Sequence, residues 1–361
     1  MNDKKIPEEL LIHIQSFIST DSLLFIGSGI SAAEGISGMP GLAQELRKSV
    51  PQVIDQSCDK YNLAQKWKPI EQKLSSGEGL ESVLLEEMND NGPLNEEILS
   101  IIKNISWSLI FKDDQNVLNS VLEGSKTLRL STFMDKFNHK NGQLCIITTN
   151  YDRLVEYALD DLNITVNTLF TDGALPRFDK NSALERGQTY SVVDRKYRQQ
   201  KRNDYALLLK PHGSISWMKN KKNGSIVSSL SLSNKSPCII TPGGTKYIQG
   251  YNSPFNEIIP LMNTEINERN KYIFIGYGFN DAHLENQLRN PQNRRKPCLI
   301  ITKYLSDTHE ILNLLENYVL IKESTSDEKS TTIIYKKDKN VKKFKSEDTL
   351  WDIQCLAEKI L

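Results

Sequence analysis

The sequence has few cysteines, no long apolar run and no excess of charge of either sign. Its five cysteines are an odd number, are widely spaced, and include no pair at the C-x-x-C distance. This pattern argues against a zinc ribbon and against a disulfide framework. No stretch reaches the apolar length of a membrane span, and the N-terminus lacks the apolar run of a signal peptide. We therefore expect a soluble, cytoplasmic protein.

Positive and negative side chains balance over the whole chain. Lys plus Arg and Asp plus Glu each number 45, so the overall charge indicates neither nucleic acid nor a membrane as a partner. The basic stretch from Lys336 to Lys345 is typical of a solvated face. The length of 361 residues exceeds that of a usual single domain, which favours one large α/β domain with an insertion, or two domains.

The feature that organises the chain is a glycine turn near the N-terminus. The apolar residues 23–26 run directly into Gly27-Ser28-Gly29, as in a buried strand that ends in a tight turn. With Ala32 they satisfy the G-x-G-x-x-G/A spacing, in which glycines let the backbone approach a diphosphate and small residues such as Ser31 begin a helix facing it. Many strand-to-helix turns need glycine for geometry only, so the motif alone leaves ligand binding open.

Further short apolar runs predict a parallel sheet. Core strands are expected over 144–148, 205–210, 271–275 and 298–302, and an edge strand over Tyr318–Ile321. Residues 51–140 show helical periodicity and no strand-like alternation. We therefore predict an α/β fold: a Rossmann-like doubly wound parallel sheet formed by residues 1–50 and 141–361, with a helical insertion over 51–140.

Two smaller features are expected around this sheet. Gly38-Met39-Pro40-Gly41 breaks the helical pattern and predicts a loop over the phosphate site. Ser346 is placed to cap a closing helix that ends the chain.

Polar clusters follow the predicted strands, where open α/β sheets gather their ligands. They are Thr149-Asn150-Tyr151-Asp152, Pro211-His212-Gly213-Ser214 and Gly276-Tyr277-Gly278. The Asn150 amide can hydrogen-bond a ribose hydroxyl or orient a water, and the His212 imidazole can take a proton. Each residue also has a structural explanation. Asn150 or Asp152 could cap the helix that begins near Arg153, His212 could cap its turn, and Tyr277 could pack beside the glycines.

Taken in order with the glycine turn, these clusters resemble the sirtuin family, whose pattern is G-A-G-x-S, T-Q-N-x-D, H-G-S or H-G-x, and G-T-S. The resemblance implies the sirtuin Rossmann-like domain with NAD as ligand. It implies that Gly27, Ser28, Gly29 and Ser31 cradle the phosphates. It also implies that Asn150 and Asp152 organise the nicotinamide ribose and the attacking group, and that His212 acts as base. By the same resemblance Thr149 belongs to the NAD site, and Gly276 and Tyr277 border the adenosine half.

The departures from the sirtuin pattern narrow this expectation. Sirtuin deacylases carry two C-x-x-C pairs for a structural zinc after the H-G motif, whereas that region here contains only Cys238. The G-I-P-x-F-R segment is replaced by Gly35-Ile36-Ser37-Gly38-Met39-Pro40-Gly41-Leu42. The chain is similar to the divergent, zinc-free sirtuin-like branch of bacterial antiphage defence proteins, which hydrolyse NAD and starve the infected cell.

This resemblance predicts a metal-free NAD+ glycohydrolase that releases nicotinamide and ADP-ribose in abortive infection. An NAD-dependent protein deacylase, an ADP-ribosyltransferase, and a sensor that binds NAD or ADP-ribose without cleaving it remain alternatives. The resemblance also implies that the activity is controlled by self-assembly into homo-oligomers, by a HerA-type hexameric ATPase, or by an Argonaute-like protein. Direct binding to nucleic acid or to a membrane is not expected.

Overall fold

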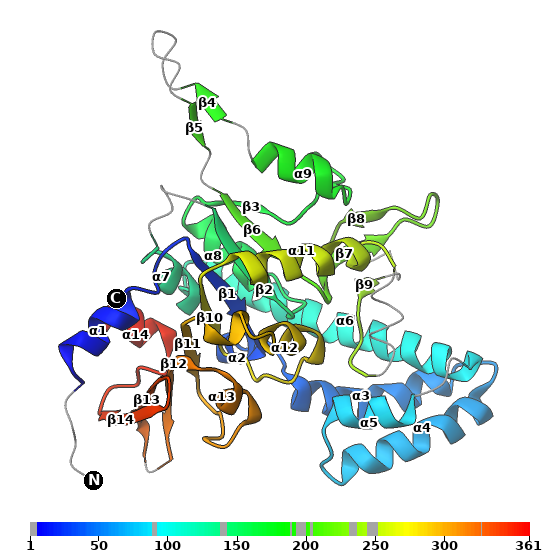
Figure 1. Ribbon diagram of the computed structural model, residues 1–361. Helices are drawn as coiled ribbons and strands as arrows, with labels where there is room; N and C mark the ends of the chain where they lie inside the picture. The colour runs from blue at the N-terminus through cyan, green and yellow to red at the C-terminus, as the bar shows by residue number, and fades with distance from the viewer. Residues whose placement is uncertain are drawn as a thin grey trace.

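The computed structural model describes residues 6–88, 92–137, 143–187, 190–192, 200–202, 205–230, 237–243, 252–325 and 327–361. Among these residues, nine strands form one sheet in the order β14-β13-β12-β11-β10-β1-β2-β6-β3 (Figure 1). Their bounds are β1 (Ser22–Ile26), β2 (Leu144–Thr148), β3 (Thr165–Asn167), β6 (Tyr205–Leu209), β10 (Lys271–Ile275), β11 (Cys298–Thr302), β12 (Asn317–Ser324), β13 (Asp327–Lys337) and β14 (Asn340–Ser346).

The sheet is doubly wound, as the sequence predicts. Every neighbouring pair from β12 to β3 is parallel. The chain adds β2, β6 and β3 on one side of β1 and then returns to add β10, β11 and β12 on the other. The order of the strands therefore reverses between β1 and β10, which is where this class of fold opens a crevice for ligands.

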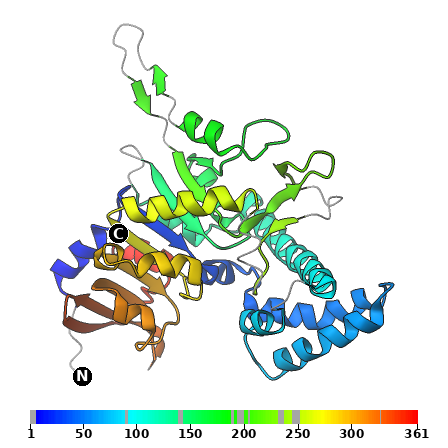
Figure 2. The ribbon, with the colours of Figure 1, turned by 45° about the vertical axis from the view of Figure 1, so that its right-hand side comes forward.

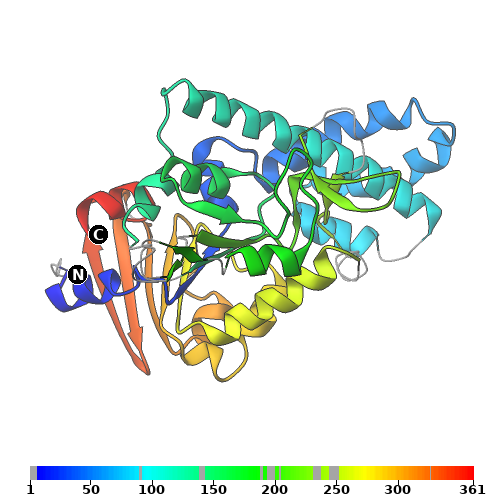
Figure 3. The ribbon, with the colours of Figure 1, turned by 90° about the horizontal axis from the view of Figure 1, so that it is seen from above.

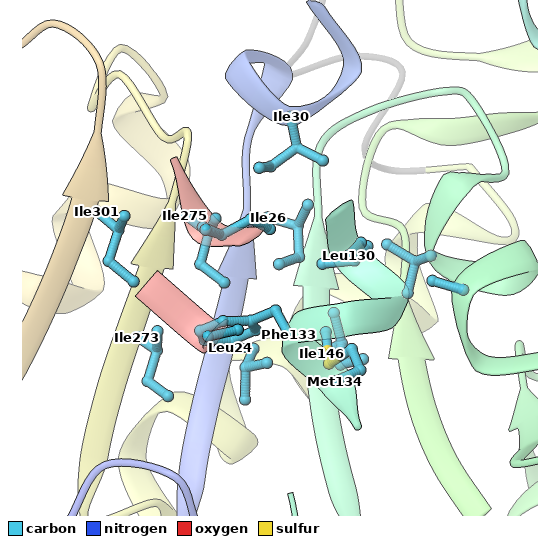
Figure 4. Packing of buried hydrophobic residues seen from close by; sticks show 14 of the residues in the cluster. Leu24, Ile26, Ile30, Leu130, Phe133, Met134, Ile146, Ile273, Ile275 and Ile301 are labelled. Carbon is cyan, nitrogen blue, oxygen red and sulfur yellow. The ribbon is translucent and has the colours of Figure 1, made fainter. Parts of the chain in front are cut away.

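The central strands are apolar on both faces because both faces are covered. In β1 all positions are buried; Leu24 and Ile26 belong to one core cluster, and Leu23 and Phe25 to the other. Figure 4 shows the first cluster, where side chains of β1, β2, β10 and β11 meet Ile30 and helix α7. Continuous rather than alternating apolar strands are what a parallel sheet between two helical layers requires.

Two layers of helices enclose the sheet (Figure 3). The first face carries α1 (Glu8–Gln15), α2 (Ser28–Glu34), α7 (Arg129–Met134), α8 (Leu154–Asp161) and α14 (Ile353–Lys359). The second carries α11 (Phe255–Glu268), α12 (Ala282–Leu288), α13 (Glu310–Leu314) and the three-stranded sheet of β7 (Gly213–Lys219), β8 (Ile226–Ser228) and β9 (Pro237–Ile239). Apart from the helices between β1 and β2, the other described elements are α9 (Lys180–Gly187), the β4 (Tyr190–Val192) and β5 (Gln200–Arg202) pair, and the short η2 (Asn293–Arg295).

The segment between β1 and β2 is helical. After α2 it forms α3 (Met39–Ile54), α4 (Lys60–Ser75), α5 (Leu80–Glu87) and the long α6 (Pro93–Leu122). These helices bury a core cluster of their own around Trp67 and stand beside the sheet, and α6 runs from them back toward it (Figure 2). The division of the chain at residues 50 and 140 stays a prediction. Within the described residues, no helix combines the length and apolar character needed to cross a bilayer.

Three local expectations were wrong. Strand β12 is not an edge, because β13 and β14 extend the sheet beyond it and include the basic stretch from Lys336 to Lys345. Gly38 ends a short connection, and Met39 already begins α3 with proline in its first turn, a position where the missing N–H costs nothing. Helix α14 is capped by Asp352, which accepts from the Gln354 N–H at 2.9 Å, while Ser346 ends β14.

Candidate active site

A cleft opens at the carboxyl ends of β1, β2, β6 and β10, at the point where the strand order reverses. It contains about 970 Å³ of space, counting the part open to solvent. Residues from all of the predicted clusters line it: Gly27, Ser28, Ser31, Thr149, Asn150, Asp152, His212 and Tyr277. The topology therefore brings together groups that are far apart in the sequence.

The glycines of the first turn are packed against the turn that follows β10. The Gly29 N–H donates to the Gly276 carbonyl at 2.9 Å. A Cβ on Gly27 would lie 2.4 Å from the same carbonyl oxygen, and Gly276 has a φ of +58°. These glycines allow two backbones to touch, a requirement apart from any ligand. Gly29 and Gly276 form this contact and are not among the cleft-lining residues, whereas Gly27 and Ser28 are.

Asn150 ties the glycine turn to the end of β2. Its side-chain nitrogen donates to the Gly27 carbonyl and to the Ser31 hydroxyl, both at 2.9 Å. Because both amide hydrogens have partners, the group that Asn150 can still offer a ligand is its side-chain oxygen, an acceptor. That oxygen suits a hydroxyl or a water as partner.

Asp152 is buried, and its carboxylate accepts hydrogen bonds from two neighbours. One carboxylate oxygen accepts from the Ser31 hydroxyl at 2.6 Å, and the other from the Leu154 N–H at 3.2 Å in the first turn of α8. Burial raises the pKa of Asp152, although the charge of Lys210 and both hydrogen bonds act in the opposite direction. Asp152 therefore caps α8, as its structural explanation predicts, and also contacts Ser31 at the cleft.

Lys210 holds the backbone of Asp152 in place, a role that the sequence pattern did not predict. It is fully buried, and its ammonium group donates to the Asp152 carbonyl and to a Glu156 carboxylate oxygen. Burial raises the pKa of Glu156, and Lys210 counteracts that rise. A lysine that closes an otherwise apolar strand was the available signal, because a buried ammonium group needs partners of this kind.

His212 stands at the wall of the cleft on a rigid turn. Its carbonyl accepts from the Ile240 N–H at 2.9 Å. Gly213 follows with a φ of +86°, where an added Cβ would lie 2.2 Å from the Cys238 carbonyl. The imidazole Nε2 lies 2.9 Å from a carboxylate oxygen of Asp281, which follows β10. Asp281 also lines the cleft, although the sequence analysis quoted no site role for it.

Tyr277 is chiefly a packing residue that also borders the cleft. Its ring lies 5.1 Å from that of Phe279 and 5.9 Å from that of Phe274. Burial raises the pKa of its phenol well above the usual range. Its buried hydroxyl has no hydrogen-bond partner among the described residues, so it is a polar group that a ligand can satisfy.

Helix α6 holds the loops around the cleft in place. The carboxylate of Asp113 accepts from the Ser37 N–H at 2.9 Å. The neighbouring Asp114 is fully buried and accepts from the backbone N–H and guanidinium group of Arg153. Ile110 of the same helix lines the cleft. Met39, Leu42 and Glu81 line it as well, so the helical segment forms part of the wall.

The family model of the SIR2-like domain matches residues 144–342, more than half of the 361-residue chain. No curated protein of known function matches the sequence. Among the described residues, no group of three or more His, Cys, Asp or Glu side chains is placed to hold a metal ion.

Proposed function

Because the chain belongs to the SIR2-like family, whose members are NAD-dependent enzymes, we propose that it cleaves NAD+ with water into nicotinamide and ADP-ribose. The observation that carries the proposal is the meeting of His212 and Asn150 in one cleft with a strand–glycine–helix turn. Such a turn suits a diphosphate, and an imidazole with a fixed carboxamide suits the chemistry at the neighbouring ribose.

The reaction breaks the bond between the nicotinamide nitrogen and the ribose carbon. Its electron pair leaves with nicotinamide, the ribose carbon passes through an oxocarbenium-like state, and water supplies the new oxygen. In the proposed mechanism the Asn150 side-chain oxygen accepts from a ribose hydroxyl or from that water, and His212 takes the proton that is released. Asp152 accepts from the Ser31 hydroxyl, which in turn accepts from the Asn150 amide. Asp152 thereby fixes the orientation of both side chains.

In the proposed complex, an extended dinucleotide lies along the residues of the cleft. Ser28 and Ser31 lie at the start of α2 and line the cleft, where the positive end of the helix dipole and the serine hydroxyls favour an anionic group. Tyr277 contributes a hydroxyl at the same cleft that has no hydrogen-bond partner in the described part of the chain. We place the diphosphate at the serines and the adenosine half beside Tyr277.

We further propose that the activity depletes NAD during antiviral defence. The support is the resemblance of Thr149-Asn150-Tyr151-Asp152 and of the segment from Gly276 to Asp281 to the antiphage branch. Control by homo-oligomers, by a HerA-type ATPase or by an Argonaute-like protein belongs to the same proposal. Measuring cellular NAD during phage infection, with wild-type protein and with His212→Ala, tests the biological role. Equal NAD pools in the two strains would contradict it.

Incubation of the purified protein with NAD, followed by chromatography and by calorimetric measurement of NAD binding, tests the chemistry. ADP-ribose that forms without an acyl substrate supports the glycohydrolase. Product that requires an acetylated peptide indicates a deacylase, and ADP-ribose attached to protein indicates a transferase. Tight binding with no product is expected of a sensor and also of a glycohydrolase that its controlling partner has not activated, whereas the absence of binding contradicts the proposal altogether.

A further inference from the structure

The imidazole of His212 and the carboxylate of Asp281 are in close contact at the wall of the cleft. Nε2 of the imidazole and the carboxylate oxygen Oδ2 are 2.9 Å apart, and only 12% and 9% of the two side chains are exposed. The two residues come from different loops, one after β6 and the other after β10. Their meeting therefore depends on the order of the strands and not on local sequence.

The carboxylate of Asp281 is held in a fixed direction by helix α12. Its other oxygen, Oδ1, accepts from the Leu284 N–H at 3.4 Å, and its carbonyl accepts from the Glu285 N–H at 2.9 Å. Leu284 and Leu288 anchor the helix in the core. One oxygen thus caps the helix while the second faces the imidazole.

We propose that Asp281 is a positioning residue that keeps the proton of neutral His212 on Nε2 and so leaves the lone pair of Nδ1 to act as the base. A carboxylate accepts only, so the nitrogen that faces it carries the proton. The same carboxylate stabilises the imidazolium that forms once Nδ1 has taken a proton from water. This inference rests on the proposed function only in its last step, the use of Nδ1 on the attacking water.

Among the described residues, the ionisable groups on which the charge of Asp281 acts are an acid and two phenols. The charge of Asp281 acts on Glu285 of α12 and on the phenols of Tyr151 and Tyr277, and Glu81 of α5 acts on both phenols. Burial raises the pKa of each phenol, which keeps it uncharged. A pH profile of the site therefore includes the titration of Glu285, whose pKa burial raises to about 7.

Two substitutions separate orientation of His212 from capping of α12. Asp281→Asn and Asp281→Ser both keep a good N-cap oxygen, but neither provides a carboxylate for Nε2. We expect each variant to unfold at nearly the wild-type temperature and to lose about 10- to 100-fold in kcat, with KM for NAD changed less than about threefold. We also expect an altered pH profile. Glu285→Gln, which removes a nearby carboxylate and leaves Asp281 in place, serves as the control.

The protonation of the ring is measured without NAD. Long-range ¹H–¹⁵N spectra of histidine-labelled protein, assigned with His212→Gln, report which nitrogen of His212 carries the proton. The wild type and Glu285→Gln are expected to show a single Nε2–H form, and Asp281→Ser a mixture of both forms. An unchanged tautomer in Asp281→Ser overturns the inference, as does wild-type kcat in both Asp281 variants. If the wild type does not turn over NAD, the proposed function fails, and the tautomer alone decides the orienting role of Asp281.

Discussion

The Ser31 hydroxyl donates to the buried carboxylate of Asp152 at 2.6 Å, which joins the first turn after β1 to the end of β2. The same hydroxyl accepts from the Asn150 amide at 2.9 Å. Ser31 is thus the shared partner of the two polar residues that follow β2, so its removal affects both of them.

Ser31→Ala should lower the free energy of unfolding by about 1–3 kcal/mol, because Asp152 and Asn150 each lose a buried partner. It should also raise the pKa of Asp152 further, since the Ser31 bond is one of the contacts that lower it. Urea unfolding measures the loss. The matched control is Ser28→Ala, which removes an exposed hydroxyl from the same turn and should change stability by less than about 0.5 kcal/mol. Equal stability of the two variants would contradict this role of Ser31.

His212→Ala should abolish NAD turnover while keeping the fold. Loss of a general base lowers kcat by about 10²- to 10⁴-fold, and the side chain lies at the cleft wall and not in the core. Steady-state kinetics and a thermal melt measure the two quantities. His13→Ala is the control, because His13 lies on α1 beside Phe17 and Tyr335 and should leave kcat unchanged.

Asn150→Ala should lose turnover to a similar degree and should also cost about 1–3 kcal/mol of stability, because two hydrogen bonds to the glycine turn disappear. Kinetics and urea unfolding on the same preparation separate the two effects. Wild-type turnover in both Asn150→Ala and His212→Ala would refute the assignment of the active site.

Gly27→Ala should destabilise the protein by about 1–3 kcal/mol through overpacking. The new Cβ would lie 2.4 Å from the Gly276 carbonyl oxygen and 2.5 Å from Cα of Tyr277, and neither backbone atom can move aside alone. Gly38→Ala is the matched control: it also lines the cleft, but its nearest neighbour would be a proline ring atom at 3.8 Å. Thermal melts of both variants make the comparison, and a tolerated Gly27→Ala would show that the two turns are free to separate.

Lys210→Met should cost about 3–5 kcal/mol, since it leaves buried carboxylates without their cation. The pKa values of Asp152 and Glu156 are already raised by burial and should rise further without Lys210. Acids whose folded-state pKa is raised favour folding in the protonated form, so the loss should be larger at pH 8 than at pH 5. Urea unfolding at both pH values tests this. The double variant Lys210→Met/Glu156→Gln should recover part of the loss, and a loss independent of pH would argue against the charge explanation.

Substitution of Glu285 by glutamine should increase the stability of the fold in a pH-dependent way. Burial raises its pKa to about 7, above the unfolded value. The wild type therefore loses stability as the pH rises from the ordinary glutamate range to about 7. Glu285→Gln should match the wild type near pH 4.5 and exceed it at pH 8, by about 1 kcal/mol after allowance for its partial exposure. Thermal melts across this range measure the difference. Glu310→Gln should show the opposite sign, because Arg289 lowers the pKa of Glu310.

The sequence allowed the central strands to be predicted with little error because their signal is local. Residues 144–148, 271–275 and 298–302 are strands with the expected bounds, since a strand buried on both faces is a short apolar run that a turn must end. The β13–β14 hairpin was missed for the opposite reason. It lies at the rim of the sheet, where most of β14 faces solvent, so its lysines resemble those of a solvated loop.

Most residues of the candidate site could be predicted from the sequence, but the contacts among their side chains could not. Strand ends carrying Asn150, His212 and glycines are visible in the sequence, and their convergence follows from the fold class. The pairing of His212 with Asp281, and that of Lys210 with Glu156, depends on which strands and helices are neighbours and at what register. A local pattern carries no such information.

The two edge strands of the main sheet, β14 and β3, both disfavour pairing with a strand of another molecule, for different reasons. At one margin, β14 presents Lys343 and Lys345 to solvent; at the other, β3 extends for only three residues. Charge repels an incoming strand at the first, and shortness leaves few backbone groups to pair with at the second. We therefore expect copies of this protein that associate to meet through surfaces other than these two edges.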